Sequence, residues 1–187
     1  LAIGSPKIET PDDYYNALKA VLKANPKTPK GEKRYALSLY DFDYPLYLTG
    51  YWGFKRGWQI DDDNSFTYWA FTDQGKEMTK WFNQIYRDGN LDPDAFANKF
   101  DDWKAKFSAE RIAGSIGSWW MCWNAGHEVW QSLDPKTPEN KRYVQVGFKA
   151  PDAKAAYITG KNKYGSYETI VTDKAKDVEN IIRFINF

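Results

Sequence analysis

The chain has 187 residues, enough for one domain or for one domain and part of another. Its 26 Lys and Arg residues nearly balance its 25 Asp and Glu residues, and no basic run alternates with aromatic residues, so nucleic acid is not an expected partner. The single Cys122 and single His127 exclude an internal disulfide and a Cys/His zinc site within the chain. No apolar run approaches the roughly 18 residues of a membrane span.

Aromatic residues are unusually abundant. They make up 18 % of the sequence, with nine Trp and 13 Tyr, although the mean hydropathy is only −0.71. Much of the apolar surface therefore comes from amphipathic aromatic rings, which are common at carbohydrate-binding and protein–protein interfaces. The sequence begins at Leu1 without a signal-peptide pattern and ends at Phe187 directly after an apolar stripe. We therefore expect an internal piece of a longer protein, whose targeting segment would lie outside it.

The first elements are a helix and a strand. Thr10 is a typical N-cap, Pro11 suits the first helical position, and Asp12 and Asp13 suit the positive end of the helix dipole. Apolar residues then recur at helical spacing until Asn25–Pro26, which ends the helix. After a polar loop, residues 35–40 have the composition of a strand.

The next stretch predicts a short helix and a hairpin. Leu46–Trp52 is expected to be helical and to end at Gly53, and Trp58–Phe71 to form a hairpin that turns at Asp61–Ser65. The three carboxylates of that turn resemble part of a calcium loop. The alternating ligands, glycine and distant Glu of an EF-hand are missing, however, so a solvated turn is favoured over a metal site.

Another helix begins after Thr72 as N-cap and ends at Asp88–Gly89. Its apolar stripe consists of Met78, Trp81, Phe82 and Ile85. Residues 90–94 form a turn that leads towards the basic end of a further helix near Phe107.

The remaining chain predicts two helices and several strands. The helices are Ala125–Leu133 and Lys174–Phe187, and the second should bury Val178, Ile181, Ile182 and Ile185. The candidate strands are Tyr143–Phe148, Ala155–Gly160 and Glu168–Thr172.

The most informative stretch follows residue 111. Ile112–Ile116 suits a buried strand, Gly117–Ser118 suits a turn, and Trp119, Trp120 and Trp123 follow within five residues. Ligand sites of α/β proteins lie at the carboxyl ends of strands, and flat indoles cover the apolar faces of sugar rings well. A single Trp is more often part of a core. Three of them at one strand exit favour a ligand site instead.

A second strand exit, Asp41–Pro45, carries aromatic and acidic side chains. Asp41 and Asp43 would lie roughly 6 to 7 Å apart on one side of a strand, which is compatible with a glycosidase pair but not specific for one. Such carboxylates equally accept hydrogen bonds from sugar hydroxyls, so binding is favoured over hydrolysis. One of the two could instead cap the following helix. The sequence contains no nucleophile elbow, P-loop, zinc-protease or dinucleotide motif.

Several sequence segments resemble segments of the extracellular sugar-binding proteins of ABC importers, the large family that includes maltose-binding protein, and they follow one another in the same order as in that family. They are Thr10–Tyr15 with the strand exit and Pro45–Leu46, then Thr72–Pro93, Phe107–Trp119 and Thr172–Asn186. Together they span nearly the whole chain, although each phrase alone is degenerate. Arg111 and Gly114 depart from the family pattern, which has small or apolar residues and Met there.

The resemblance implies an α/β fold of the type II periplasmic-binding-protein class. Residues 1–145 would form most of the second lobe, and residues 146–187 would return through the hinge to the first lobe. The protein would be a monomeric receptor and not an enzyme, without cofactor or metal. It would bind a saccharide and deliver it to an ABC permease in the membrane. Its location would be extracytoplasmic, either as a cell-surface lipoprotein or in a periplasm.

The resemblance also implies a set of saccharide-binding residues. Trp119 would stack on a sugar ring with Trp123 behind it, and Trp120 adds a further indole. Side chains of the first strand exit and of the loop before the last strand would complete the site: Asp41, Phe42, Asp43, Tyr44, Tyr164 and Tyr167. The alternatives are a glycoside-active enzyme or carbohydrate-binding module with the same aromatic cleft, and an interaction domain whose aromatic residues are core.

Overall fold

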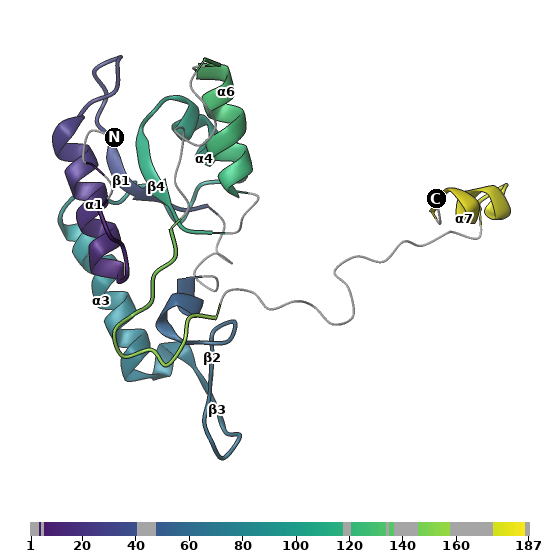
Figure 1. Ribbon diagram of the computed structural model, residues 1–187, viewed down its shortest axis with the longest axis horizontal. Coiled ribbons are helices and arrows are strands. Elements are labelled where there is room, and N and C mark those ends of the chain that lie inside the picture. The colour runs from purple at the N-terminus through teal and green to yellow at the C-terminus, as the bar shows by residue number, and fades with distance from the viewer. Residues whose placement is uncertain are drawn as a thin grey trace.

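The computed structural model describes residues 4, 6–40, 48–117, 121–133, 135–136, 146–157 and 174–185. Its elements, shown in Figure 1, are α1 (Pro11–Ala24), β1 (Tyr35–Ser38), η1 (Gly50–Trp52), β2 (Trp58–Ile60), β3 (Phe66–Tyr68), η2 (Trp69–Phe71), α3 (Asp73–Arg87), α4 (Phe100–Ser108), β4 (Ile112–Ser115), η3 (Cys122–Glu128), α6 (Val129–Leu133) and α7 (Val178–Ile185). The segments η1 and η2 are 3-10 helices, and η3 is a π-helix. None of the helices described is long and apolar enough to cross a membrane.

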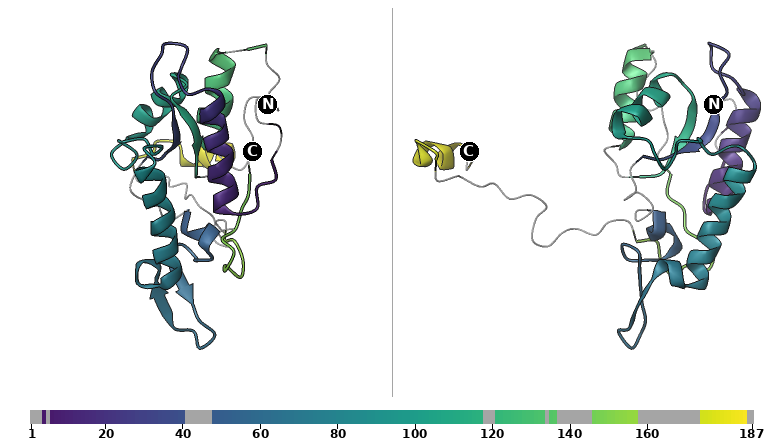
Figure 2. Two further views of the ribbon diagram at one scale, coloured as in Figure 1. Left: turned by 90° about the vertical axis from the view of Figure 1, so that its left-hand side faces the viewer. Right: turned by 180° about the vertical axis from the view of Figure 1, so that it is seen from behind.

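The centre of the fold is a parallel pair of strands. β1 pairs with β4 in the register Tyr35↔Ile112, Leu37↔Gly114 and Ser38↔Ser115. Leu91 adds a parallel bridge to Leu37 on the other edge of β1. Figures 1 and 2 show α1 and α3 on one side of this pair and α4 and α6 on the other. The described part of the chain is therefore of mixed α/β type with parallel strands, as expected.

Helix α1 begins where the sequence predicts. The Asp13 backbone N–H donates to the Thr10 Oγ1 at 3.1 Å, and the Thr10 backbone N–H donates to the Asp13 carboxylate at 2.9 Å. This reciprocal capping box satisfies two amide groups that the helix itself cannot pair. The helix then packs on β4, where the Tyr14 hydroxyl donates to the Ser115 carbonyl at 3.1 Å.

Two hydrophobic clusters lie on the two sides of the strands. The larger one joins α1, α3 and β1, and its fully buried members include Leu37, Met78 and Ile85. The smaller one consists of Tyr40, Trp103, Met121 and Ala125. Each side of the strand pair thus has its own core, as a sheet covered on both faces requires.

Helix α3 follows the prediction, and the hairpin does so as far as Tyr68, after which Trp69–Phe71 form η2 instead of continuing the strand. Thr72 accepts a hydrogen bond from the Gly75 backbone N–H at 3.0 Å, and the helix is followed by Gly89 with φ of 66°. β2 and β3 pair antiparallel with Gln59 opposite Thr67. Of the predicted stripe on α3, Met78, Trp81 and Ile85 are buried and Phe82 is half-buried.

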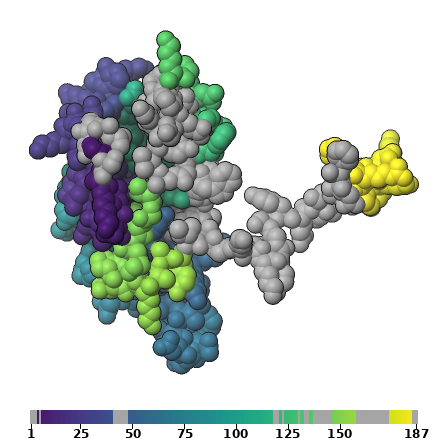
Figure 3. Space-filling model, viewed as in Figure 1, coloured from purple at the N-terminus to yellow at the C-terminus, as the bar shows by residue number. Residues whose placement is uncertain are grey.

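Residues 146–157 lie against the main body. Figure 3 shows them, in yellow-green, crossing the surface beside α1 and the hairpin. The Phe148 ring stacks on Tyr14 at 5.2 Å and on Tyr51 at 4.4 Å between ring centroids. The Ala150 backbone N–H donates to the Tyr51 carbonyl at 2.8 Å. This segment is therefore held by side-chain packing and by single backbone hydrogen bonds.

Three predictions of secondary structure are corrected. The helix expected from Ala125 begins earlier, as the π-helix η3. Residues 146–148 and 155–157, the described parts of two predicted strands, are not in strands, because their backbone groups bond singly and form no ladder. Residues 143–145, 158–160 and the predicted strand 168–172 lie outside the described residues.

The helix near the end of the chain is the third correction. α7 forms, but its apolar stripe is not buried: Val178 is 44 % exposed, Ile181 36 % and Ile182 47 %. An apolar stripe is buried only against another surface, and no described element packs on this one. The side chain of Ile185 lies outside the described residues.

Candidate functional site

The two predicted strand exits leave the same edge of the sheet. β1 and β4 run parallel, so their carboxyl ends lie together, and the Ser115 hydroxyl donates to the Ser38 carbonyl at 3.0 Å across this edge. Just beyond the strands, Tyr40 and Met121 share the smaller hydrophobic cluster. A Cβ on Gly117 would collide with the Met121 side chain, so the glycine at this turn allows that packing.

Of the nine predicted site residues, the structure describes Trp123. Asp41, Phe42, Asp43, Tyr44, Trp119, Trp120, Tyr164 and Tyr167 lie outside the described residues. Their assignment stays a prediction. The structure does bring together Tyr40 and Met121, the residues that directly flank the segments 41–47 and 118–120.

The Trp123 side chain is 47 % exposed, although tryptophan is usually buried. Its indole stacks on the imidazole of His127 with 4.3 Å between ring centroids and an angle of 24° between planes. Both residues belong to η3, and π-helical turns are rare and recur at functional sites. One face of the indole is thus covered by His127, and the residue still exposes a large area on η3.

A charged pair lies beside this stack. The Lys104 ammonium of α4 lies 2.6 Å from the Glu128 carboxylate of η3. The hydrogen bond from Lys104 lowers the pKa of Glu128 most, and a weaker contribution comes from a hydrogen bond with the Trp123 side chain. Sequence reasoning missed His127, Glu128 and Lys104. The spacing of Trp123 and His127 four residues apart could have indicated a shared helix face, but the helix was predicted to begin only at residue 125.

A buried network of hydrogen bonds holds the end of β1 in place. The Ser38 hydroxyl donates to the Asp92 carboxylate at 2.6 Å, and the Asn98 amide donates to the same carboxylate at 2.9 Å and to the Leu39 carbonyl at 2.9 Å. Burial raises the pKa of Asp92, but hydrogen bonds from Ser38, Asn98 and Lys106 outweigh it, so the pKa lies below its ordinary value. The network ties the end of β1 to the segment between α3 and α4.

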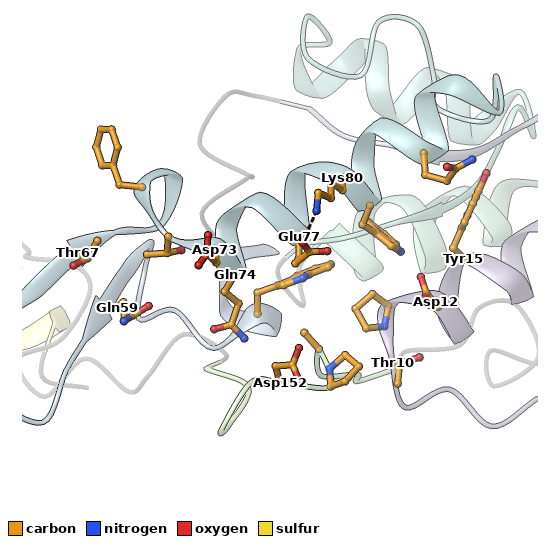
Figure 4. Close-up of a pocket in the computed structure, with 18 residues that line it drawn as sticks. Thr10, Asp12, Tyr15, Gln59, Thr67, Asp73, Gln74, Glu77, Lys80 and Asp152 are labelled. Atoms are coloured by element: carbon orange, nitrogen blue, oxygen red, sulfur yellow. Dashed lines mark hydrogen bonds and ion pairs between the residues drawn. The ribbon is translucent and has the colours of Figure 1, made fainter.

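A groove of about 950 Å³ lies elsewhere, between α1, α3, the hairpin and residues 150–152. Figure 4 shows its rim, which carries Asp12, Asp73, Glu77, Lys80 and Asp152. Trp52 and Trp81 form part of its floor. Trp123, the predicted site residue that the structure describes, is not among the residues that line it. Sequence reasoning did not foresee this groove.

Three of the four carboxylates that line this groove have ordinary explanations. Asp12 and Asp73 lie in the first turns of α1 and α3, where a negative charge interacts favourably with the helix dipole and stabilises the helix. Glu77 pairs with Lys80 at 2.6 Å. We therefore take the strand exits, together with the following segment η3 and its exposed Trp123, as the candidate site.

The acidic turn of the hairpin has a structural role. The Gln59 amide donates to the Asp61 carboxylate at 2.7 Å, and the Ser65 backbone N–H donates to the Asp63 carboxylate at 2.9 Å. These bonds close the turn between β2 and β3. Among the described residues, no group of three or more His, Cys, Asp or Glu side chains could hold a metal ion.

Comparisons with known proteins give a partial structural likeness. No protein-family model and no curated protein matches the chain. One similar solved structure is the EF-hand mutant of the S. pneumoniae ABC-transporter substrate-binding protein FusA in complex with fructo-nystose, with 23 % identity, a TM-score of 0.47, and coverage of 59 % of this chain and 24 % of that chain. Another is FusA in complex with kestose, with 21 % identity, a TM-score of 0.47, and coverage of 60 % and 24 %.

The matched region thus spans about a quarter of the length of the solved chains. Both are substrate-binding proteins of an ABC transporter, the class that the sequence phrases resemble.

Proposed function

We propose that this chain is part of an extracytoplasmic receptor that binds a saccharide and delivers it to an ABC permease. The observation that carries the proposal is the Trp123 indole, which is 47 % exposed on η3, the helical segment that follows β4 along the chain, and is stacked on His127. A flat ring held with one face covered is suited to lie against the apolar face of a sugar. The family resemblance of the sequence phrases supports the same function.

The remaining predicted residues complete the proposed site. Trp119 and Trp120 would add stacking surfaces, and Asp41 and Asp43 would accept hydrogen bonds from sugar hydroxyls. The wrong epimer would leave such polar groups unpaired, which sets specificity. The residues that flank these segments, Tyr40 and Met121, pack together at the strand exit, which is what a single site requires.

We also propose how the two lobes of the whole protein are arranged. Residues 1–145 would be most of one lobe, and residues 146–187 would lead back to a second lobe that closes over the saccharide by a hinge. In that arrangement the exposed apolar stripe of α7 would pack on the other lobe. The whole protein would be monomeric and would lie outside the cytoplasm, as a cell-surface lipoprotein or in a periplasm.

Isothermal titration calorimetry with neutral trisaccharides tests the function. The panel is maltotriose, cellotriose, xylotriose and kestose, and at least one should bind the parent protein. Trp123→Ala should weaken that binding by roughly 1 to 3 kcal/mol, about 5- to 150-fold, because a stacked aromatic surface is lost. Phe71→Ala is the matched control, since this ring is 84 % exposed but lies on η2. Failure of every panel sugar to bind would contradict the proposal.

The glycosidase alternative is separated from binding by product analysis. A receptor releases no new reducing ends from the trisaccharide that it binds. Turnover that Asp41→Asn abolishes without loss of binding would instead establish an enzyme.

A further inference from the structure

The orientation of the Trp123 ring is restrained by a contact on its face, from a neighbour in η3 that is itself next to an ion pair with α4. The His127 imidazole lies 4.3 Å from the indole with only 24° between the ring planes, so it covers one face. An exposed Trp without such a neighbour samples several rotamers, and binding a ligand to one of them costs conformational entropy. The stack removes most of that freedom before a ligand arrives.

A second contact ties the turn that carries His127 to another helix. Glu128 directly follows His127 in η3, and its carboxylate lies 2.6 Å from the Lys104 ammonium. Lys104 belongs to α4, and its neighbour Trp103 is fully buried in the smaller hydrophobic cluster. The turn of η3 that carries Trp123 and His127 is therefore linked through Glu128 and Lys104 to an anchored part of the fold.

We propose that His127, Glu128 and Lys104 are positioning residues that hold the Trp123 indole with one face open for a sugar ring. This inference rests on the proposed saccharide-binding function. It assigns roles to three residues that do not themselves need to touch the ligand.

The exposure of the pair argues against a purely stabilising role. The Lys104 side chain is 35 % exposed and the Glu128 side chain 41 %. Ion pairs this accessible to water contribute little to stability because solvent screens them. Their geometric effect on Trp123 is larger than their effect on folding, so substitutions should change ring orientation while leaving the protein folded.

Fluorine NMR on protein labelled with 5-fluorotryptophan tests the positioning directly. Trp123→Phe assigns the Trp123 resonance by its disappearance. His127→Ala should shift and broaden that resonance, because the ring current and the restraint are both lost. His127→Phe should leave the resonance narrow and displaced, because a flat ring still covers the same face. Melting curves of the variants verify that each is folded.

Saccharide affinity is the second measurement, made on the trisaccharide that binds the parent best. His127→Ala and Lys104→Met should each weaken binding about 3- to 10-fold, and His127→Phe should restore it to within about twofold of the parent. Lys80→Met is the matched control for Lys104→Met, because Lys80 forms an exposed pair of the same 2.6 Å length with Glu77 on α3. It should leave both the Trp123 resonance and the affinity unchanged.

Two failures are distinguishable. If the parent binds saccharide and Trp123→Ala weakens it, but His127→Ala and Lys104→Met bind like the parent, the positioning role is overturned and the function stands. An unchanged Trp123 resonance in His127→Ala overturns it as well. If the parent binds no saccharide, the proposed function fails, and this inference with it.

Discussion

The Lys106 ammonium lies 3.0 and 2.9 Å from the two carboxylate oxygens of Asp92. Both side chains are well covered, with exposures of 13 % and 1 %. The Lys106 ammonium also donates to the Asn98 carbonyl oxygen at 2.8 Å. A lysine on α4 thus neutralises a carboxylate that also receives the Ser38 hydroxyl at the end of β1.

Removal of this lysine should strongly destabilise the protein. Lys106→Met keeps the apolar stem but leaves the Asp92 charge buried without its cation, and we expect a loss of about 3 kcal/mol in the free energy of unfolding. Urea denaturation measures it. Lys76→Met is the control, because its pair with Asp73 is exposed and should contribute under about 1 kcal/mol. Equal losses in the two variants would contradict the role given to the buried pair.

The same carboxylate makes stability depend on pH. The pKa of Asp92 is lowered in the folded protein from its ordinary 3.8, so its contribution is fully present above the unfolded value and is lost as the pH falls through the folded value. Asp92→Asn should therefore be less stable than the parent at pH 6, and the difference should shrink steadily below about pH 4. Urea midpoints between pH 6 and pH 2 measure this, and a constant difference would count against it.

The glycine in β4 should resist enlargement. A Cβ on Gly114 would lie 2.6 Å from the Tyr14 hydroxyl oxygen and 2.7 Å from the Leu18 Cδ2, so these side chains of α1, or the helix itself, would have to shift. We expect Gly114→Ala to lower the free energy of unfolding by about 1 to 3 kcal/mol through overpacking. Gly147→Ala is the matched control, since nothing lies within 4 Å of its added methyl group. Similar thermal melting of the two variants would show that α1 accommodates the methyl group.

The first turn of α1 depends on the Thr10 hydroxyl. Thr10→Ala removes an acceptor for the Asp13 backbone N–H and should reduce stability by about 1 kcal/mol, while Thr10→Ser should retain it. Thr79 is a suitable control in the middle of α3, where its hydroxyl only donates to the Gly75 carbonyl at 2.9 Å. Thermal unfolding separates the variants, and a Thr79→Ala loss as large as that of Thr10→Ala would refute the capping interpretation.

Local rules explain why part of the fold could be predicted. The caps at Thr10 and Thr72 and the turn between β2 and β3 are set by neighbouring residues, and all three are confirmed. The stripe on α3 was also recognised, because its spacing has the helical period. These features need no knowledge of what lies far along the chain.

Distant contacts could not be predicted in the same way. Lys106 and Asp92 belong to different segments, and only the packing of α4 near β1 brings them together. The stack of Trp123 on His127 was not predicted because the helix was expected to begin only at residue 125, whereas η3 contains both residues. For α7 the helix was predicted correctly and its burial was wrong, because an apolar stripe does not identify its partner.

The hydrogen bond between Ser38 and Ser115 joins residues that are 77 positions apart. A ribosome adds about 5 to 20 residues per second, so roughly 4 to 15 s pass between the synthesis of β1 and the synthesis of β4. During that interval an apolar strand edge is unpaired, and contacts of such long range form slowly even afterwards. Newly made chains should therefore be most prone to aggregation before β4 emerges, whatever the stability of the finished fold.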